Sequence, residues 1–250
     1  MALKLIGLQV PSLLRDIVET GIVFLFPAKC RVCEAFLEFT PIPYICADCW
    51  HDIQFLEPPW CEICGTPNVK GLCDECATDP PPYGKLRSIA FYQTTLQHAI
   101  HLFKFEKKQV FAPHLIRLIN AHIPIDCCIA DYDFILPVPI HKKRLRERGF
   151  NQATLLAKGI AQTEGVPVLT NTLVRHRHTV AQSSLGMEAR QNNIIGAFEI
   201  PNPEVIRDKR ILIVDDVFTT GATVREAVNE LWKADPVEVD VLTLARTLDA

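Results

Sequence analysis

The sequence predicts an α/β protein with a mainly parallel, doubly wound sheet and a small metal-binding module near its amino end. Two observations predict the sheet. The four branched apolar residues at 211–214 show no alternation, and after residue 84 strand-like segments alternate with helix-like segments. The third observation is a set of four Cys-x-x-Cys pairs within residues 30–76. The chain therefore combines a cysteine-rich part with an open α/β part.

The elements of the α/β part follow from apolar spacing and from helix start and stop signals. Asn151 is a suitable N-cap and Gly165 a suitable stop for one helix. Apolar residues three and four positions apart mark one buried face in another helix after residue 223. Strands are expected at 86–93, 134–138, 211–214 and 237–244, and helices at 96–105, 111–122, 151–164 and 223–233. A short amphipathic helix is expected before the cysteines, at 13–26.

The composition does not favour a strongly charged partner. The 250-residue chain is 48% hydrophobic, which is ample for a buried core, and its formal net charge is only −3. Global electrostatics therefore does not indicate a nucleic-acid or membrane partner. The apolar run at 21–26 is far too short to cross a bilayer, and residues 1–10 lack the features of a secretory signal. We expect a cytoplasmic protein with no membrane span.

Eight of the ten cysteines form the four pairs, and this spacing is typical of metal sites. One pair aims two thiolates at one ion, and two pairs complete the tetrahedral shell of a structural Zn2+ ion. We expect two zinc ions bound in sequence order, with interleaved pairs as the alternative. A cytosolic compartment disfavours disulfides, and regular paired knuckles favour zinc over an iron–sulfur cluster. The expected ligands are Cys30, Cys33, Cys46, Cys49, Cys61, Cys64, Cys73 and Cys76. The adjacent Cys127 and Cys128 lack metal spacing and are expected to be buried core thiols.

The stiff segment at 79–84, Asp-Pro-Pro-Pro-Tyr-Gly, follows the last paired cysteine and predicts a domain boundary. Three parts result: an N-terminal helical segment at 1–29, a zinc module at 30–79, and an α/β domain at 84–250. Because all eight thiolates serve as ligands, zinc is expected to fold the module and to leave no open coordination position for catalysis.

Two acids and a glycine loop after the strand at 211–214 predict a site for a phosphorylated sugar. Asp215 and Asp216 are expected at the carboxyl end of that strand, where open α/β sheets bind ligands. Adjacent carboxylates suit a sugar diol or a hydrated Mg2+ ion. The loop from Thr219 to Thr223 supplies hydroxyls and a glycine that can take a positive φ, and the helix after it directs free N–H groups at a phosphate. A plain strand–turn–helix corner, with one acid as helix cap, is the structural alternative.

A basic segment follows the strand at 134–138. Five cations fall within residues 142–148, and in a chain that is acidic overall this concentration predicts a polyanion near the same crevice. A solvated basic loop is the alternative. A third stretch, at 175–193, is polar and has few core signals. Lys104 and Lys107 are expected to lie on an exposed helix face, with the lining of an acceptor hood as the alternative.

Taken together, these motifs resemble known phosphoribosyltransferases. Four apolar residues, two acids and the run Thr219-Thr220-Gly221-Ala222-Thr223 are similar to the motif with which type I phosphoribosyltransferases bind 5-phosphoribosyl-1-diphosphate (PRPP). With the paired cysteines, the run Pro-Val-Pro-Ile at 137–140 and Arg-Gly-Phe-Asn-Gln at 148–152, the chain looks like the ComF family from about 26 to 246. The resemblance implies a type I phosphoribosyltransferase-like fold preceded by a double zinc ribbon.

The resemblance also implies a role for each motif. Asp215 and Asp216 would hold the ribose hydroxyls, and the loop of Thr219, Thr220, Gly221, Ala222 and Thr223 would hold the 5-phosphate. The pyrophosphate loop would include Val138, Pro139, Lys142, Lys143 and Arg144. Arg175, Gln182 and Arg190 resemble the catalytic positions of a loop that closes over pyrophosphate, although each alone could equally be a surface residue. Mg2+ would accompany PRPP.

Two hypotheses for the function follow. The first is a phosphoribosyltransferase that binds PRPP and Mg2+, acts on an unknown acceptor and is linked to DNA uptake in natural transformation. The second is a non-catalytic PRPP-binding adaptor or regulator that works with single-stranded DNA or a competence protein. Thr219 stands where purine phosphoribosyltransferases often place an acid as general base, which disfavours deprotonation of a purine there.

Overall fold

The computed structural model describes residues 28–37, 42–177 and 194–247, so the helix predicted at 13–26 lies outside the described residues. The chain forms two compact units that divide between His51 and Asp52. This division falls between the second and third cysteine pairs, so the later cysteines share a unit with the α/β part. The boundary predicted at 79–84 stays a prediction.

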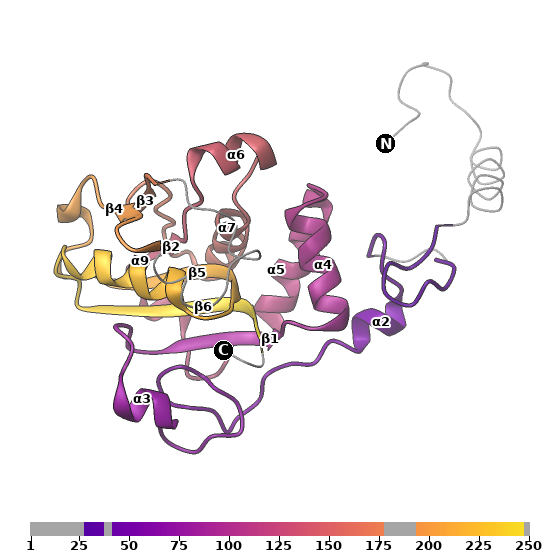
Figure 1. Ribbon diagram of the computed structural model, residues 1–250, viewed down its shortest axis with the longest axis horizontal. Coiled ribbons are helices and arrows are strands. Elements are labelled where there is room, and N and C mark those ends of the chain that lie inside the picture. Colours follow the sequence, from indigo (N-terminus) through magenta and orange to yellow (C-terminus); the bar gives the residue numbers. More distant parts are fainter. Residues whose placement is uncertain (1–27, 38–41, 178–193, 248–250) are drawn as a thin grey trace. The chain divides into compact units, whose positions relative to one another are not determined.

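The larger unit is built on a four-stranded sheet in which all paired strands are parallel (Figure 1). Its strands are β1 (Leu86–Phe91), β2 (Phe134–Pro137), β5 (Arg210–Phe218) and β6 (Glu238–Arg246), in the spatial order β1-β6-β5-β2. β5 therefore has a neighbour on each side, as its unbroken apolar run predicts. A separate antiparallel pair joins β3 (Val174–Arg175) and β4 (Phe198–Glu199).

Helices connect the parallel strands and cover the sheet (Figure 1). They are α4 (Thr94–Lys104), α5 (Ala112–Ala121), α6 (Lys142–Arg148), α7 (Gln152–Glu164) and α9 (Ala222–Trp232), with 3-10 turns η1 (Gln109–Phe111), η2 (Ile129–Asp131) and η4 (Pro203–Val205). α7 packs on β2 and β5, whereas α9 packs on β6. Side chains alternate along a strand, so Ile211 and Ile213 join the core formed with α9 while Leu212 points to the opposite face. The sheet is thus covered on both faces, and the α/β class is confirmed.

The local signals that define two of these helices act as expected. In α7, the Asn151 side chain accepts a hydrogen bond from the Ala153 N–H at 3.2 Å, and Gly165 ends the helix in a left-handed conformation with φ of 74°. In α9, the apolar positions spaced by three and four residues are all buried: Val224, Ala227, Val228 and Leu231.

The structure differs from the predictions in three places. β5 does not end at Val214 but continues through both acids to Phe218, because its parallel ladder with β6 continues to that residue. The basic segment at 142–148 is not a loop but the short helix α6. Of the two adjacent cysteines expected in the core, Cys127 is buried and Cys128 is exposed.

The cysteine-rich segments contain little regular structure. In the smaller unit, an antiparallel bridge joins Lys29 to Phe36, and one helical turn, α2 (Ala47–His51), carries Cys49. In the larger unit, the turn α3 (Asp74–Thr78) carries Cys76 in the same way. Among the described residues, no helix has the length and the apolar character that crossing a bilayer requires.

Candidate functional site

The two acids lie near the carboxyl end of the central strand, close to a lysine from another element. Asp216 is buried, with a side chain 10% exposed, and its Oδ1 lies 2.7 Å from Nζ of Lys104. Lys104 is the last residue of α4. Its side chain is only 19% exposed, so the exposed helix face predicted for Lys104 is wrong. One ion pair between two largely buried side chains therefore neutralises half of the acidic pair.

The environment of Asp215 disfavours its charge. Burial raises the pKa of its carboxyl, and the neighbouring charge of Asp216 raises it further. The charges of Lys104 and Arg175 and a hydrogen bond from the Asp216 N–H, at 2.8 Å, lower it again, leaving a pKa of about 7. The pKa of this carboxyl is thus raised toward neutrality, and any ligand that donates hydrogen bonds or positive charge favours its ionised form.

The segment predicted to bind a phosphate, Thr219 to Thr223, connects β5 to α9 and is called the phosphate loop below. Gly221 takes the left-handed conformation with φ of 73°, and α9 begins at the next residue. The first N–H groups of a helix have no hydrogen-bond partner within the helix. Together with the positive end of the helix dipole, they are directed at the space next to the loop. This geometry suits an anion. Thr219, Thr220 and Thr223 are partly exposed beside it, whereas Gly221 and Ala222 are buried.

Cations from three elements act on the acidic pair. Arg175, in β3, is 7% exposed; burial and the positive charge of Arg144 lower its pKa to about 10, while the charge of Asp215 opposes this shift. The structure therefore brings Arg175 within electrostatic range of both Asp215 and Arg144, and Arg148 within range of both Asp216 and Arg144. Gln182 and Arg190, the other two predicted catalytic residues, lie outside the described residues.

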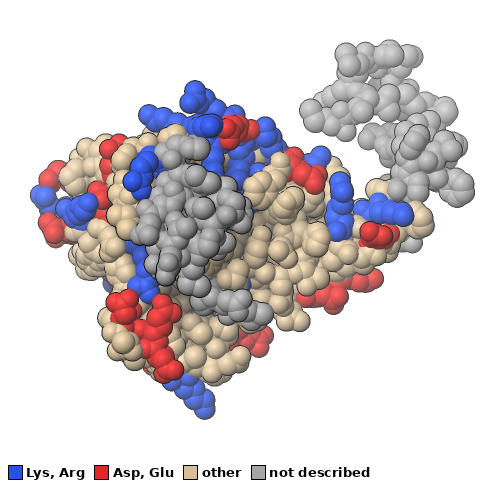
Figure 2. Space-filling view, viewed as in Figure 1, with Lys and Arg blue, Asp and Glu red and all other residues tan. Residues whose placement is uncertain are grey.

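The predicted pyrophosphate residues divide into two groups. Val138 is buried beside β5, where its N–H donates to the Val214 carbonyl at 2.9 Å, and Pro139 is partly exposed next to it. Arg144 is partly buried, but Lys142 and Lys143 are exposed on α6. Figure 2 shows Lys and Arg side chains gathered over α6 at the top of the view. A helical rather than extended backbone spaces these cations around an axis, so they do not all face the acids.

Sequence reasoning missed two residues of the site, Lys104 and Arg148. Lys104 follows the buried Ile100 by four positions, so it lies on the apolar face of α4, and this spacing is the signal that could have revealed it. Arg148 is influenced by the charge of Asp216, and burial lowers its pKa. It donates to the side chain of the buried Gln152 at 2.6 Å. A glutamine on the buried face of a helix indicates a polar partner of this kind.

The paired cysteines form two clusters in sequence order. Within each cluster the sulfur atoms all lie within 4.8 Å of one another. The first cluster is Cys30, Cys33, Cys46 and Cys49, and the second cluster is Cys61, Cys64, Cys73 and Cys76. A tetrahedral Zn2+ ion with Zn–S bonds of about 2.3 Å separates its sulfurs by about 3.8 Å. The Cys33–Cys46 and Cys64–Cys73 sulfur distances are 3.7 and 3.6 Å, so both clusters fit zinc.

The two clusters repeat the same thiolate environment. Burial raises the pKa of Cys30, but N–H groups of residues 33, 46 and 32 outweigh it and lower the pKa to about 6. Cys61 has the same pattern, again with a pKa of about 6. The last cysteine of each cluster, Cys49 or Cys76, has a raised pKa because of burial and of the thiols around it. Backbone N–H groups thus favour the thiolate form of the first cysteine in each cluster, which is the form that binds a metal cation.

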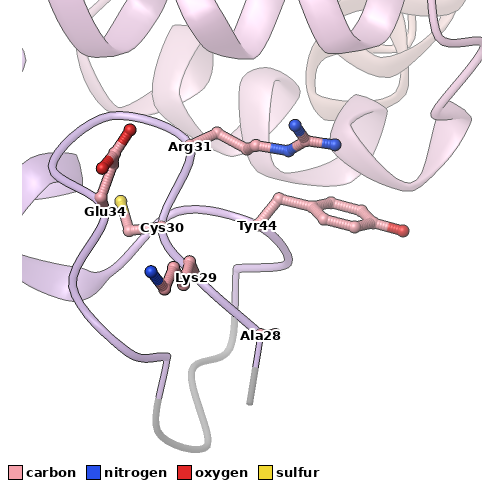
Figure 3. A pocket seen from close by; sticks show the side chains of 6 residues that line it. All are labelled: Ala28, Lys29, Cys30, Arg31, Glu34 and Tyr44. Atoms are coloured by element: carbon pink, nitrogen blue, oxygen red, sulfur yellow. The ribbon is translucent and has the colours of Figure 1, made fainter. Parts of the chain in front are cut away.

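Beside the first cluster lies an open pocket lined by Ala28, Lys29, Cys30, Arg31, Glu34 and Tyr44. Figure 3 shows the side chains of Arg31 and Tyr44 extending in the same direction from two adjacent segments. The Arg31 N–H donates to the Tyr44 carbonyl at 2.9 Å and holds these segments together. The pocket therefore belongs to the folded first cluster.

Comparison with protein families and known proteins agrees with this organisation. The double zinc ribbon domain matches residues 22–77, and the phosphoribosyl transferase domain matches residues 147–249. DNA utilization protein YhgH of Salmonella typhimurium is 31% identical over 227 residues, which cover 89% of this chain and 98% of that protein. Competence protein F of Haemophilus influenzae is 30% identical over 210 residues, which cover 81% of this chain and 90% of that protein.

Solved structures with a similar fold include glutamine PRPP amidotransferase from B. subtilis complexed with ADP and GMP. It aligns with 58% of this chain and 30% of its own chain, at 18% sequence identity and a TM-score of 0.40.

Proposed function

The chain belongs to the family of DNA utilization protein YhgH and competence protein F, and from this premise we propose that it binds PRPP at the carboxyl end of β5 and transfers its phosphoribosyl group to an acceptor. The observation that carries the proposal is the position of the acidic pair at the end of a central parallel strand, immediately before a phosphate loop that opens a helix. Sugar hydroxyls and a phosphate are the groups that these two features bind best.

In this proposal Asp215 and Asp216 accept hydrogen bonds from the ribose hydroxyls, and the phosphate loop donates to the 5-phosphate. The diphosphate then extends toward Val138 and Arg144 on one side and Arg175 on the other. The cations that act on the acids, Lys104, Arg148 and Arg175, would lie within range of a bound polyanion, as would Arg144, which acts on Arg148 and Arg175. When bound with PRPP, Mg2+ would be held mainly by the ligand's own oxygens together with the ribose-binding carboxylates, and it would supply positive charge to the diphosphate.

The chemical step is a displacement at the anomeric carbon. The bond from that carbon to the diphosphate oxygen breaks, the diphosphate leaves with the electron pair, and the acceptor's nucleophile forms the new bond. Arg144 and Arg175 stabilise the negative charge that develops on the leaving diphosphate. Removal of one well-placed donor of this type costs on the order of 10^2 to 10^3 in rate.

The names of the relatives, DNA utilization protein and competence protein, support a link to DNA use, so we propose that the acceptor or the regulated partner belongs to DNA uptake. A second candidate, a PRPP-binding regulator that acts with single-stranded DNA or a competence protein, is favoured by Thr219. This residue has no carboxylate with which to remove a proton from an acceptor.

Release of diphosphate tests the proposal. The zinc-loaded protein is incubated with PRPP and Mg2+, with and without cell metabolites or single-stranded DNA, and PRPP binding is measured in parallel by calorimetry. We expect metabolite-dependent release that is lost in an Asp215→Ala, Asp216→Ala double variant. The control is Asp131→Ala, which changes an exposed acid of η2. Binding without release would identify the regulator, and no binding at all by the folded protein would contradict both candidates.

A further inference from the structure

Two buried arginines attach the second cysteine cluster to the sheet of the larger unit. Arg87 of β1 is 4% exposed and Arg246 of β6 is 1% exposed. Arg246 donates from Nη1 to the Cys64 carbonyl at 2.9 Å and from Nη2 to the Thr66 hydroxyl at 3.3 Å. The same hydroxyl lies 3.0 Å from the Cys64 sulfur. A single side chain thus separates the guanidinium group from a predicted zinc ligand.

Arg246 also contacts the residue that supports the phosphate loop. Its guanidinium carbon lies 5.4 Å from the centre of the Phe218 ring, and the two residues are register partners in the ladder of β5 and β6. The Thr247 N–H donates to the Phe218 carbonyl at 3.0 Å and holds this register. Because the guanidinium is planar and its donors are fixed in one plane, its orientation toward Cys64 also determines the position of its face against the ring.

The Phe218 ring in turn lies against Gly221 of the phosphate loop. A Cβ atom placed on Gly221 would be 2.9 Å from Cζ of Phe218, so the ring leaves room only for a hydrogen there. Phe218 is 6% exposed and cannot turn away without opening the core. A displacement of the ring therefore moves or loosens the backbone that carries the phosphate-binding N–H groups.

We propose that Arg246 is a positioning residue that couples the second cysteine cluster to the phosphate loop, through Cys64 and Thr66 on one side and Phe218 and Gly221 on the other. The inference rests on the proposed function, since it concerns the affinity of the phosphate loop for PRPP. A metal centre with four thiolates carries net negative charge, which holds the cationic Arg246 in place. Loss of the metal would alter the attraction between the cluster and Arg246. The packing of Arg246 on Phe218, which supports the phosphate loop, would change with it.

Arg246 could have a simpler role, which is to anchor the ribbon, defined here as residues 60–78, for stability alone. Arg87 is a buried arginine of the same molecule that has this simpler role. Arg87 donates to the Glu62 carbonyl at 3.0 Å and bonds the Asp126 carboxylate, and its guanidinium lies over Trp60 at 5.4 Å. The contacts described for Arg87 lead to the ribbon and to Asp126, and none of them leads to the phosphate loop. It is therefore a matched control for a buried arginine that only anchors.

A second connection between the ribbon and α9 is weaker. Arg225, in the first turn of α9, lies 3.2 Å from Glu75 of α3. Glu75 is highly exposed, and exposed ion pairs contribute little. We assign the coupling to the buried route through Arg246.

Coupling between two sites acts in both directions. If the second cluster supports PRPP binding, bound PRPP must stabilise the second cluster. The zinc-loaded full chain is therefore exposed to a chelator with pulses of N-ethylmaleimide, with and without saturating PRPP and Mg2+, and alkylation of each cysteine is followed by peptide mass spectrometry. We expect PRPP to slow alkylation of the second cluster by roughly 5-fold or more, the lower end of ordinary couplings, and to leave the first cluster unchanged.

Two variants distinguish coupling from anchoring. Arg246→Met is expected to remove the protection by PRPP at the second cluster and to weaken PRPP binding, whereas Arg87→Met lowers thermal stability but keeps the protection. If Arg246→Met does not fold, Phe218→Leu takes its place, because it removes the ring between Arg246 and Gly221 and leaves the arginine's bonds to the ribbon intact.

The outcomes separate the inference from the proposed function. Absence of PRPP binding by calorimetry overturns both. PRPP binding with equal alkylation of the second cluster in its presence and absence overturns the coupling alone. Equal loss of protection in Arg246→Met and Arg87→Met also overturns it, because any anchoring residue would then suffice.

Discussion

Opposing electrostatic effects set the pKa of the Asp215 carboxyl. Burial and its neighbour Asp216 raise the pKa of Asp215 to about 7, and Lys104 keeps it from rising further. The protein thus holds two adjacent acids in a sheltered place, and the cations around them leave the pKa of Asp215 well above its usual range. Such an arrangement costs stability and is retained where a ligand completes it.

Asp215→Asn is expected to stabilise the protein and to weaken PRPP binding by more than roughly 10-fold, the cost of one charge-assisted hydrogen bond. The folded-state pKa is raised from 3.8, so the proton on Asp215 stabilises the fold fully below about pH 4, and this contribution is lost as the pH rises through about 7. The asparagine avoids that loss. We expect a gain of about 1–3 kcal/mol at pH 8 and a smaller gain at pH 5.

Thermal unfolding of both proteins at the two pH values measures the effect of Asp215→Asn. A variant that is less stable than the wild type at pH 8 would show that the acidic pair is already fully neutralised without ligand.

Lys104→Met is expected to destabilise the protein by about 1–3 kcal/mol, because it leaves the buried carboxylate of Asp216 without its ion pair while keeping an apolar stem of similar length. Added Mg2+ should raise the melting temperature of the variant more than that of the wild type, since the cation can neutralise the same carboxylates. The control is Lys107→Met, which changes an exposed lysine and should shift stability by less than about 0.5 kcal/mol. Equal effects of the two substitutions would contradict the ion pair.

At the scale of elements, the corner between β5 and α9 combines a strand that extends through the acids with a glycine that starts the next helix. Gly221 has two separate constraints, a positive φ and the close approach of the Phe218 ring. Because β5 extends to Phe218, it places the Phe218 ring against Gly221 of the loop. The length of the strand is therefore one reason why this position needs a glycine.

Gly221→Ala is therefore expected to cost more stability than the backbone conformation alone explains. The left-handed conformation costs a non-glycine residue about 1–2 kcal/mol, and the contact with Phe218 adds to it. The matched control is Gly165→Ala at the end of α7, which has φ of 74° and nothing within 4 Å of the added Cβ. Chemical unfolding gives the two free energies, and calorimetry gives PRPP affinity. We expect only Gly221→Ala to lose affinity, and a similar loss in both variants would contradict the role of the ring contact.

At the scale of the whole molecule, the boundary between the two compact units falls between the two cysteine clusters. The first cluster belongs to the smaller unit, and the second cluster belongs to the unit that contains the sheet. We therefore expect two clusters with the same sulfur arrangement to differ in which part of the chain a bound metal would stabilise.

We expect two zinc ions per chain by elemental analysis, one for each cluster. Cys49→Ser and Cys76→Ser change the last cysteine of each cluster and should each lower the content to about one ion. Only Cys76→Ser should lower the melting temperature of the transition that PRPP stabilises, because the second cluster is packed on the sheet through Arg87 and Arg246. A wild-type content near zero would overturn the metal assignment, and equal melting shifts would contradict the division.

Local patterns in the sequence determined much of this protein. The unbroken apolar run placed β5 inside the sheet, Asn151 and Gly165 predicted the ends of α7, and the spacing of the cysteines predicted two clusters in sequence order. Each of these depends on neighbours along the chain, for which spacing and propensity are sufficient. The acidic pair and the phosphate loop belong to the same class, and their roles stay predictions until PRPP binding is measured.

Only the tertiary structure decided which distant residues meet. The pairing of Lys104 with Asp216, the packing of Arg246 between Cys64 and Phe218, and the unit to which each cysteine cluster belongs join residues far apart in the sequence. A lysine near a helix end and an arginine at the end of a strand are ordinary surface residues by local criteria. Their burial results from the order of strands in the sheet and from the packing of the second cysteine cluster. Both depend on the free energy of the whole core and not on any short segment.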